Sequence, residues 1–213
     1  MDGLGPRTET GPLVGVRECA QRAAPHHLTR GPAVYQVVGP EPLAAERSLN
    51  MEKSMGAGVR LVPMTESEFS AYEQAEAQEY AGENVRAGYW AEAEAIDRAW
   101  KSHRLLLPQG ASTAGHHFCH VVDEKSGEHV GSIWWFEDRE GSVPRAFVYH
   151  ILVEPRWRRK GYGSAALMAV EAQARALGMV AVGLHVFAHN PEAIRVYERL
   201  GFRTTSLNML KPL

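Results

Sequence analysis

The pattern of apolar and polar residues is clearest between residues 146 and 178. Residues 146–153 are almost all apolar or aromatic, which is typical of a strand buried on both faces. Pro155 ends this strand because it has no N–H to donate to a ladder. From Ser164 onward, apolar residues recur at helical spacing until Gly178. A glycine readily adopts the left-handed backbone conformation that ends many helices. The pattern predicts a strand, a turn and a helix.

A second strand and a short helix are predicted next. Residues 180–187 form another apolar run. Asn190 and Pro191 then match the cap and the first position of a helix. The apolar face of this helix consists of Ala193, Ile194, Tyr197 and Leu200, and the helix ends at Gly201 and Phe202.

The pattern also predicts elements upstream of residue 146. Residues 59–62 predict a first strand, and Thr65 with Glu68 forms a capping box that begins a helix. We expect this helix to end near Tyr80, with a break at residues 81–84.

A second helix is predicted over residues 91–106, where Pro108 stops it. Residues 117–124 and 128–136 predict a hairpin, and residues 137–145 a charged loop.

Three histidines of the hairpin raise the question of a metal site. On a strand, His116 and His120 share one face while His117 points to the other. No Cys, His or Asp completes a ligand set with them. We therefore predict no metal site.

Composition separates the first 57 residues from the rest. Residues 1–57 contain four Gly-Pro pairs and show neither the helical nor the strand period of apolar residues. We therefore predict that they are a mostly disordered extension. Met51 and Met55 precede the first convincing strand, so a later natural start is a hypothesis. Residues 58–213 are predicted to form one domain.

Charge and cysteine content narrow the functional class. A hydrophobic content of 45% can build a core, and a net charge of −2 gives no general attraction to nucleic acid or to an anionic membrane. Two cysteines, Cys19 and Cys119, indicate no disulfide framework, so we expect a reducing cytoplasmic setting. No apolar run reaches the length needed to span a membrane.

The turn between the strand at 146–153 and the following helix is a candidate anion site. A helix N-terminus offers unpaired N–H groups and a positive dipole end, and glycines let a bulky anion approach the backbone. The residues that we assign to this site are Arg158, Arg159, Lys160, Gly161, Tyr162, Gly163 and Ser164.

The motif is neither of the two common phosphate loops. Ala166 replaces the third glycine of GxGxxG, and there is no GxxxxGK[ST]. What remains is RxxGxG, at Arg158, Gly161 and Gly163. Read alone, it also fits a solvated basic turn, or a nucleic-acid patch with Arg156, although the low net charge argues against the patch.

The order strand, RxxGxG, helix, strand, Asn190, AxxxY (Ala193 to Tyr197) and Gly201-Phe202 resembles the GNAT N-acetyltransferase superfamily. Within it, the strings LLLPQG, LHVFAHN and VYERLGF are similar to a group of bacterial acetyltransferases of unassigned substrate. The resemblance covers about residues 58–213. It implies an α/β (α+β) fold, with a mixed, mostly antiparallel central sheet that splays at the acetyl-CoA site and flanking helices.

The resemblance also implies roles for particular residues. A bulge in the strand at 146–153 would leave two backbone N–H groups near Ile151, Leu152 and Val153 for the thioester carbonyl and pantetheine. Tyr197 matches the tyrosine that protonates the thiolate, although it also fits a core position. Asn190 matches the family's asparagine before the last helix, so the resemblance implies a cofactor contact for it, although a cap alone would also explain this residue.

The general base is less well specified. Many family members carry a Glu or His where this chain has Phe147 and Tyr149, so the sequence departs from that pattern. His150 is the nearest side chain with a useful pKa, and simple alternation would aim it away from the face of Tyr149 unless a bulge intervenes. Glu137, or a water chain without a single base, competes with His150.

The resemblance also implies that the turn between the two predicted helices borders the acceptor site, which makes Tyr80, Tyr89 and Trp90 candidate acceptor contacts, with Glu137 as a further candidate. Aromatic packing beneath the turn is the simpler explanation for each of the three.

The resulting hypothesis is an acetyl-CoA-dependent enzyme that acetylates a primary amine by direct attack in a ternary complex. The alternative is a non-catalytic sensor that binds coenzyme A. Expected partners are a small-molecule or peptide amine and, as a hypothesis, a second copy of the chain; we expect no metal, nucleic acid or membrane partner. The sequence does not specify the acceptor.

Overall fold

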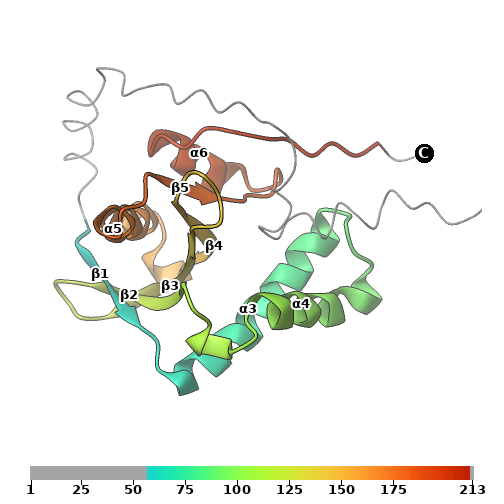
Figure 1. Ribbon diagram of the computed structural model, residues 1–213, viewed down its shortest axis with the longest axis horizontal. Helices are drawn as coiled ribbons and strands as arrows, with labels where there is room; N and C mark the ends of the chain where they lie inside the picture. The colour runs from blue at the N-terminus through green and yellow to red at the C-terminus, as the bar shows by residue number, and fades with distance from the viewer. Residues whose placement is uncertain (1–56, 212–213) are drawn as a thin grey trace, which may run out of the picture. The chain divides into compact units, whose positions relative to one another are not determined.

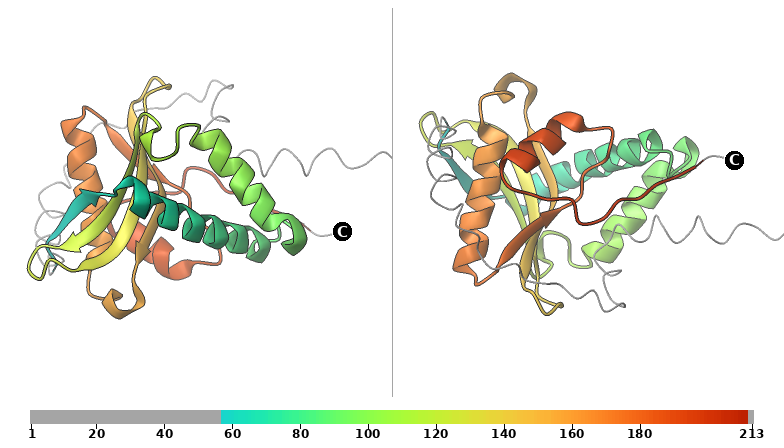
Figure 2. Two further views of the ribbon diagram at one scale, coloured as in Figure 1. Left: turned by 90° about the horizontal axis from the view of Figure 1, so that it is seen from below. Right: turned by 90° about the horizontal axis from the view of Figure 1, so that it is seen from above.

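A five-stranded sheet with helices on both faces forms the domain. The computed structural model describes residues 57–211, so the predicted extension at residues 1–57 lies outside the described residues except for Ala57, and its disorder stays a prediction. Helices α3 and α4 cover one face of the sheet and α5 covers the other (Figures 1 and 2). In chain order the elements are β1 (Val59–Pro63), α3 (Glu66–Arg86), α4 (Glu92–Leu106), η2 (Gly110–Ser112), β2 (His116–Asp123), β3 (His129–Asp138), β4 (Arg145–Val153), η3 (Pro155–Trp157), α5 (Tyr162–Ala176), β5 (Ala181–Leu184) and α6 (Pro191–Arg199).

The sheet has the order β1-β2-β3-β4-β5. Its first four strands pair antiparallel with their neighbours, and β5 pairs parallel with β4. This arrangement confirms the predicted mixed, mostly antiparallel sheet. The parallel connection from β4 to β5 needs a crossover, which α5 provides.

The predicted break in the first helix was wrong. The capping box at Thr65 and Glu68 begins α3 as expected, but α3 continues through residues 81–84 to Arg86. Ala81 and Asn84 are buried, and the Asn84 side chain donates a hydrogen bond to the Tyr80 carbonyl (2.8 Å). Packing of this last part of the helix therefore outweighs the low helix propensity of Gly82.

A buried charged pair joins α3 to α4. His103 of α4 is buried, and its Nε2 lies 2.5 Å from Glu76 Oε2 and its Nδ1 3.5 Å from Glu73 Oε1, both on α3. Burial alone lowers the pKa of His103, but the hydrogen bond and charge of Glu76 outweigh it, so the net pKa is raised. Both side chains are buried, so removal of either partner would leave the other buried between the two helices without its close neighbour.

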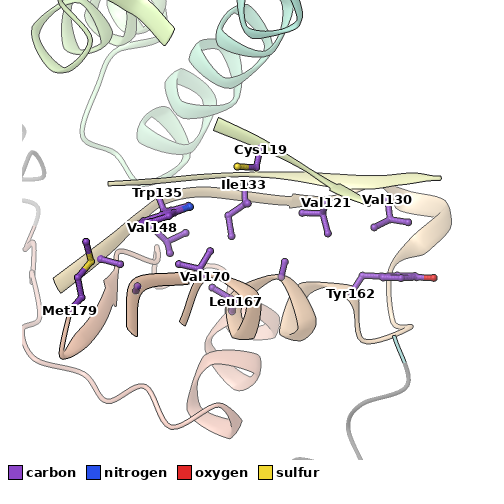
Figure 3. Packing of buried hydrophobic residues seen from close by; sticks show 13 residues of the cluster. Cys119, Val121, Val130, Ile133, Trp135, Val148, Tyr162, Leu167, Val170 and Met179 are labelled. Carbon is purple, nitrogen blue, oxygen red and sulfur yellow. The ribbon is translucent and has the colours of Figure 1, made fainter. Parts of the chain in front are cut away.

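The main core lies between the sheet and α5. Ile133, Trp135 and Val148 point from the sheet toward Leu167 and Val170 of the helix (Figure 3). The opposite face of the sheet carries a second cluster under α3, formed by Phe69, Leu107, Phe118 and Trp134. Successive residues such as Trp134 and Trp135 thus face different layers, as the period of a strand requires.

The strand predicted over residues 180–187 was too long. β5 ends at Leu184 because its pairing with β4 stops at the Val148–Leu184 pair, and residues 185–190 leave the sheet as a loop. An apolar run does not fix the end of a strand when the partner strand diverges.

One substitution made at two glycines should have opposite effects on stability. A Cβ at Gly131 would lie 2.0 Å from the Leu152 carbonyl oxygen in the next strand, whereas one at Gly82 in α3 would meet only the Arg86 side chain at 3.8 Å. We expect Gly131→Ala to lower the free energy of unfolding by about 3 kcal/mol, and Gly82→Ala to raise it by about 0.5–1 kcal/mol. Denaturant unfolding measures both. Destabilisation by Gly82→Ala would contradict a continuous α3.

Candidate active site

One extra residue in β4 changes which side chains face α3. Trp134 of β3 lies opposite His150 and Trp135 lies opposite Val148, so Tyr149 has no partner in the register. The bulge cancels one step of alternation. Tyr149 stacks on Trp134 (centroids 4.5 Å apart), and His150 also turns to this face, toward Tyr72 of α3. The face that simple alternation predicts for His150 is therefore not the observed one.

The same region of β4 has an open edge. β5 pairs with residues 145–148 only, and within the described residues no strand continues along residues 149–153 on that side. The Glu154 amide donates to Val130 of β3 (2.9 Å). Because amides alternate along a strand, those of Ile151 and Val153 point to the open edge, while that of Leu152 points to β3.

The loop before α5 has the form of an anion site. Arg159 (φ 63°) and Gly161 (φ 90°) adopt left-handed conformations, and α5 begins at Tyr162. Among residues 57–211, nothing accepts a hydrogen bond from the backbone amides of residues 159–164. These amides lie at the positive end of a 15-residue helix.

The side chains of the loop connect it to the end of β4. Arg158 Nε donates to the Val153 carbonyl (3.0 Å), at the open edge of the strand, and Lys160 Nζ lies 4.5 Å from the centroid of the Trp157 ring. The Tyr162 ring is buried against Trp157 in the main core (Figure 3), so only its backbone can face a ligand. Gly163 and Ser164 follow as the next residues of the helix.

His150 lies between two side chains of α3. Its Nδ1 is 2.9 Å from the Tyr72 hydroxyl, and its Nε2 is 3.3 Å from Glu79 Oε2. The hydrogen bond to His150 is the main reason that the pKa of Glu79 is lowered, although partial burial opposes it. Burial raises the pKa of Tyr72 well above its usual value, so this hydroxyl keeps its proton at neutral pH.

Two other side chains that could act as bases are less suitable. Glu137 lies opposite Ala146, near the start of β4, and its oxygens bind His117 (2.9 Å) and Arg139 (2.9 Å). Burial raises its pKa, but these hydrogen bonds outweigh it and the pKa is lowered, which makes a weaker base. Burial lowers the pKa of His116 to about 4. The roles predicted for Glu137 stay predictions.

Tyr197 and Asn190 both belong to α6. Asn190 caps the helix by accepting a hydrogen bond from the Ala193 amide (3.1 Å), with Pro191 at the first position. Tyr197 packs against the main core, and burial raises its pKa. A raised pKa keeps the phenol protonated, as a proton donor requires.

The aromatic residues near the turn between α3 and α4 divide into two kinds. Trp90 is buried and packs edge to face on Tyr80 (5.2 Å), which agrees with the simpler packing role. Tyr89 is 6.4 Å from Phe187 in the loop after β5. The same loop contacts α3 through His189 and Glu83. The turn and the loop therefore lie side by side beyond the end of β5.

Sequence reasoning missed Tyr72 and Glu79. The two residues are seven apart, so they share one face of α3, and that spacing was visible in the sequence. No sequence neighbour of His150 indicated that its side chain would reach α3, because the bulge determines which face of the sheet His150 occupies.

An open strand edge with free amides leads to a helix N-terminus whose amides are also free, an arrangement that suits an extended ligand carrying phosphate. Comparison with known proteins identifies the family. The chain belongs to the acetyltransferase (GNAT) family. The sequence profile of this family matches residues 71–202. The chain is therefore an acetyltransferase enzyme, and the family resemblance found in the sequence is confirmed.

Two relatives come from Bacillus subtilis (strain 168). Uncharacterized N-acetyltransferase YdgE is 33% identical over 153 residues, 72% of this chain and 97% of the relative. Uncharacterized N-acetyltransferase YycN is 36% identical over 156 residues, 73% of this chain and 99% of the relative. A crystal structure of putative acetyltransferase YycN from the same species has a TM-score of 0.69 at 35% identity, covering 73% of this chain and 98% of that one.

Two features are absent from residues 57–211. No group of three or more His, Cys, Asp or Glu side chains in this part could hold a metal ion. Its helices are each too short or too polar to cross a membrane.

Alanine at each of the two glycines that flank α5 distinguishes an effect on anion binding from an effect of backbone strain. Gly161 and Gly178 both have positive φ (90° and 78°), so alanine at either costs about 1 kcal/mol of strain. We expect Gly161→Ala to weaken coenzyme A binding about tenfold, because the loop amides shift. Gly178→Ala should leave binding unchanged. Calorimetric titration measures both, and equal affinities for the two variants would contradict an anion site at this loop.

Proposed function

We propose that the protein transfers the acetyl group of acetyl-CoA to a primary amine by direct attack in a ternary complex. One observation carries this proposal: the open edge of β4 ends at the anion loop, and Arg158 links the two through the Val153 carbonyl. Amides of Ile151 and Val153 would bind the pantetheine chain and the thioester carbonyl. The loop from Arg158 to Ser164 would bind the diphosphate.

His150 is proposed as the base that makes the amine neutral. In the tautomer that donates Nδ1–H to the Tyr72 hydroxyl, Nε2 has a free lone pair. Nε2 takes a proton from the incoming ammonium group. The hydrogen bond between Nε2 and Glu79, 3.3 Å apart in the structure, belongs to this protonated ring, because a carboxylate can only accept from an Nε2–H. Glu79 stabilises the imidazolium, and Tyr72 holds the ring.

The neutral nitrogen then forms a bond to the thioester carbon. The Ile151 and Val153 amides stabilise the negative oxygen of the tetrahedral intermediate. As the carbon–sulfur bond breaks, Tyr197 gives its proton to the departing thiolate, and the acetylated nitrogen releases its remaining extra proton. Solvent restores the Tyr197 proton and takes the protons that His150 and the acetylated nitrogen give up, so the products are an amide and coenzyme A thiol.

The acceptor is proposed to enter between α3 and the loop after β5, where Tyr89 and Phe187 lie together. Glu79 and Glu83 on this face of α3 are one turn apart and would favour a cationic amine. Cys119 is a free thiol in the core, which supports the reducing cytoplasm as the proposed location.

Replacement of Tyr197 by phenylalanine tests the proposed acid. We expect Tyr197→Phe to lower kcat about 100-fold with a panel of primary amines, while coenzyme A binding stays unchanged. Thiol release measures the rate, and calorimetry measures binding. If thiol release is absent in the unmodified enzyme for every amine while coenzyme A binds, the result supports a non-catalytic sensor instead.

Paired variants test the proposed base. His150→Asn should lower kcat/KM about 100-fold. Glu79→Gln should lower kcat/KM only about tenfold, because the glutamine amide oxygen still accepts a hydrogen bond from Nε2 of His150. A full rate in His150→Asn would eliminate His150 as the base and favour a water chain.

A further inference from the structure

His103 is a buried titratable residue that the proposed reaction does not use. It lies on α4 and is only 3% exposed. Its Nε2 contacts Glu76 at 2.5 Å, and its Nδ1 lies 3.5 Å from Glu73, both on α3. Glu76 is also buried, and a buried carboxylate is costly unless an opposite charge compensates it. The pair therefore depends on the proton that His103 carries.

Glu76 lies between the two residues of α3 that hold the proposed base. Tyr72 is four residues before Glu76 and Glu79 is three residues after it, so the three side chains share one face of the helix. Tyr72 and Glu79 contact the two ring nitrogens of His150. A displacement of α3 at Glu76 would therefore move both partners of the base.

His103 also contacts the strand next to the base. Its ring packs edge to face on Trp134 of β3, with the centroids 5.8 Å apart. Trp134 is buried and lies opposite His150 in the β3–β4 ladder. One side chain of α4 thus contacts both the helix that holds His150 and the strand that pairs with it.

The charge of Glu76 acts on Tyr72. Burial raises the pKa of Tyr72, and the carboxylate of Glu76 is the next largest cause of this rise. A protonated His103 compensates that carboxylate, whereas a neutral His103 leaves the surroundings of the Tyr72 hydroxyl more negative. The charge of His103 therefore affects the group that holds the His150 ring.

Carboxylates are the charged groups that face His103. Glu76 and Glu73 do so from α3. From β3, Trp134 donates its indole N–H to His116 Nδ1 (2.9 Å), and burial lowers the pKa of His116 to about 4, so that ring is neutral at neutral pH. Burial alone would lower the pKa of His103, but the two glutamates outweigh burial and raise it.

Given the proposed role of His150 as the base, we propose that protonated His103 positions α3 against β3 for catalysis, and that loss of this proton at alkaline pH displaces the residues that hold His150. With His103 neutral, Glu76 is a buried carboxylate without a compensating charge, so α4 moves away to admit water or Glu76 takes up a proton. His103 is a positioning residue, because it acts through Glu76 and Tyr72.

The pH dependence of unfolding tests the pair without any substrate. The pKa of His103 is raised in the folded chain, so the pair stabilises fully below about pH 6.5, the pKa of a free histidine, and loses this effect as the pH rises through the folded value. We expect the denaturation midpoint of the unmodified chain to fall between about pH 6.5 and about pH 9. The double variant, His103→Gln with Glu76→Gln, carries neither charge and should show a smaller fall. Equal falls in the two proteins would overturn the proposal.

Rates of the full chain test the positioning. With a primary amine that gives thiol release, kcat/KM of the unmodified enzyme should decline as His103 loses its proton above neutral pH. His103→Gln leaves Glu76 uncompensated and should lower kcat/KM about tenfold at about pH 7. The double variant should recover most of this loss and lack the alkaline decline. As a matched control, Glu94→Gln removes a carboxylate that pairs with Arg98 on the surface of α4 (3.0 Å), and it should leave the pH profile unchanged.

The outcomes separate this positioning role from the proposed function. Thiol release that is insensitive to His103→Gln, or a double variant no faster than the single one, would overturn the positioning role alone. Absence of thiol release with every amine would instead contradict the proposed function, while the denaturation midpoints still test the pair.

If His103→Gln fails to fold, nuclear magnetic resonance of the unmodified enzyme decides. The imidazole signals that are missing from the double variant belong to His103. Their titration should coincide with the alkaline decline in kcat/KM, and a midpoint more than about one pH unit away from that decline would refute the link.

Discussion

The extra residue in β4 is the constraint on which the rest of the site depends. With Tyr149 inserted, Tyr149 and His150 occupy the same face, and the strand beyond them no longer follows β5. A regular β4 would direct His150 into the α5 layer. The bulge therefore produces the contact between His150 and α3, and it lies at the point where the pairing of β4 with β5 ends, at Val148.

The open edge matters because of what lies at its end. Arg158 binds the last carbonyl of β4, and the chain then turns through two left-handed residues into the N-terminus of α5. Backbone amides of the strand and of the helix thus form one series of donors. A ligand with a linear arm attached to a diphosphate matches such a series better than a compact one, and acetyl-CoA contains such a part, in which the diphosphate joins the pantetheine arm to the adenosine.

Sequence patterns predicted the order of elements, the capping box at Thr65, the cap at Asn190 and the glycine-containing turn before α5. These features depend on neighbours within a few residues, so the sequence carries them directly. The predicted ends of α3 and β5 were wrong. Packing on α4 determines where α3 ends, and divergence from β4 determines where β5 ends. The partners of His150 could not be inferred, since they lie 71 and 78 residues away and meet it only through the bulge.

Residue-resolved amide hydrogen exchange with and without coenzyme A tests the central claim most directly. The bulge predicts that saturating coenzyme A slows exchange at Ile151 and Val153 together with residues 161–164, and leaves Leu152 unchanged because that amide already belongs to the β3–β4 ladder. Unchanged exchange at both Ile151 and Val153 in the presence of bound coenzyme A would contradict the claim that the bulge opens β4 for this ligand.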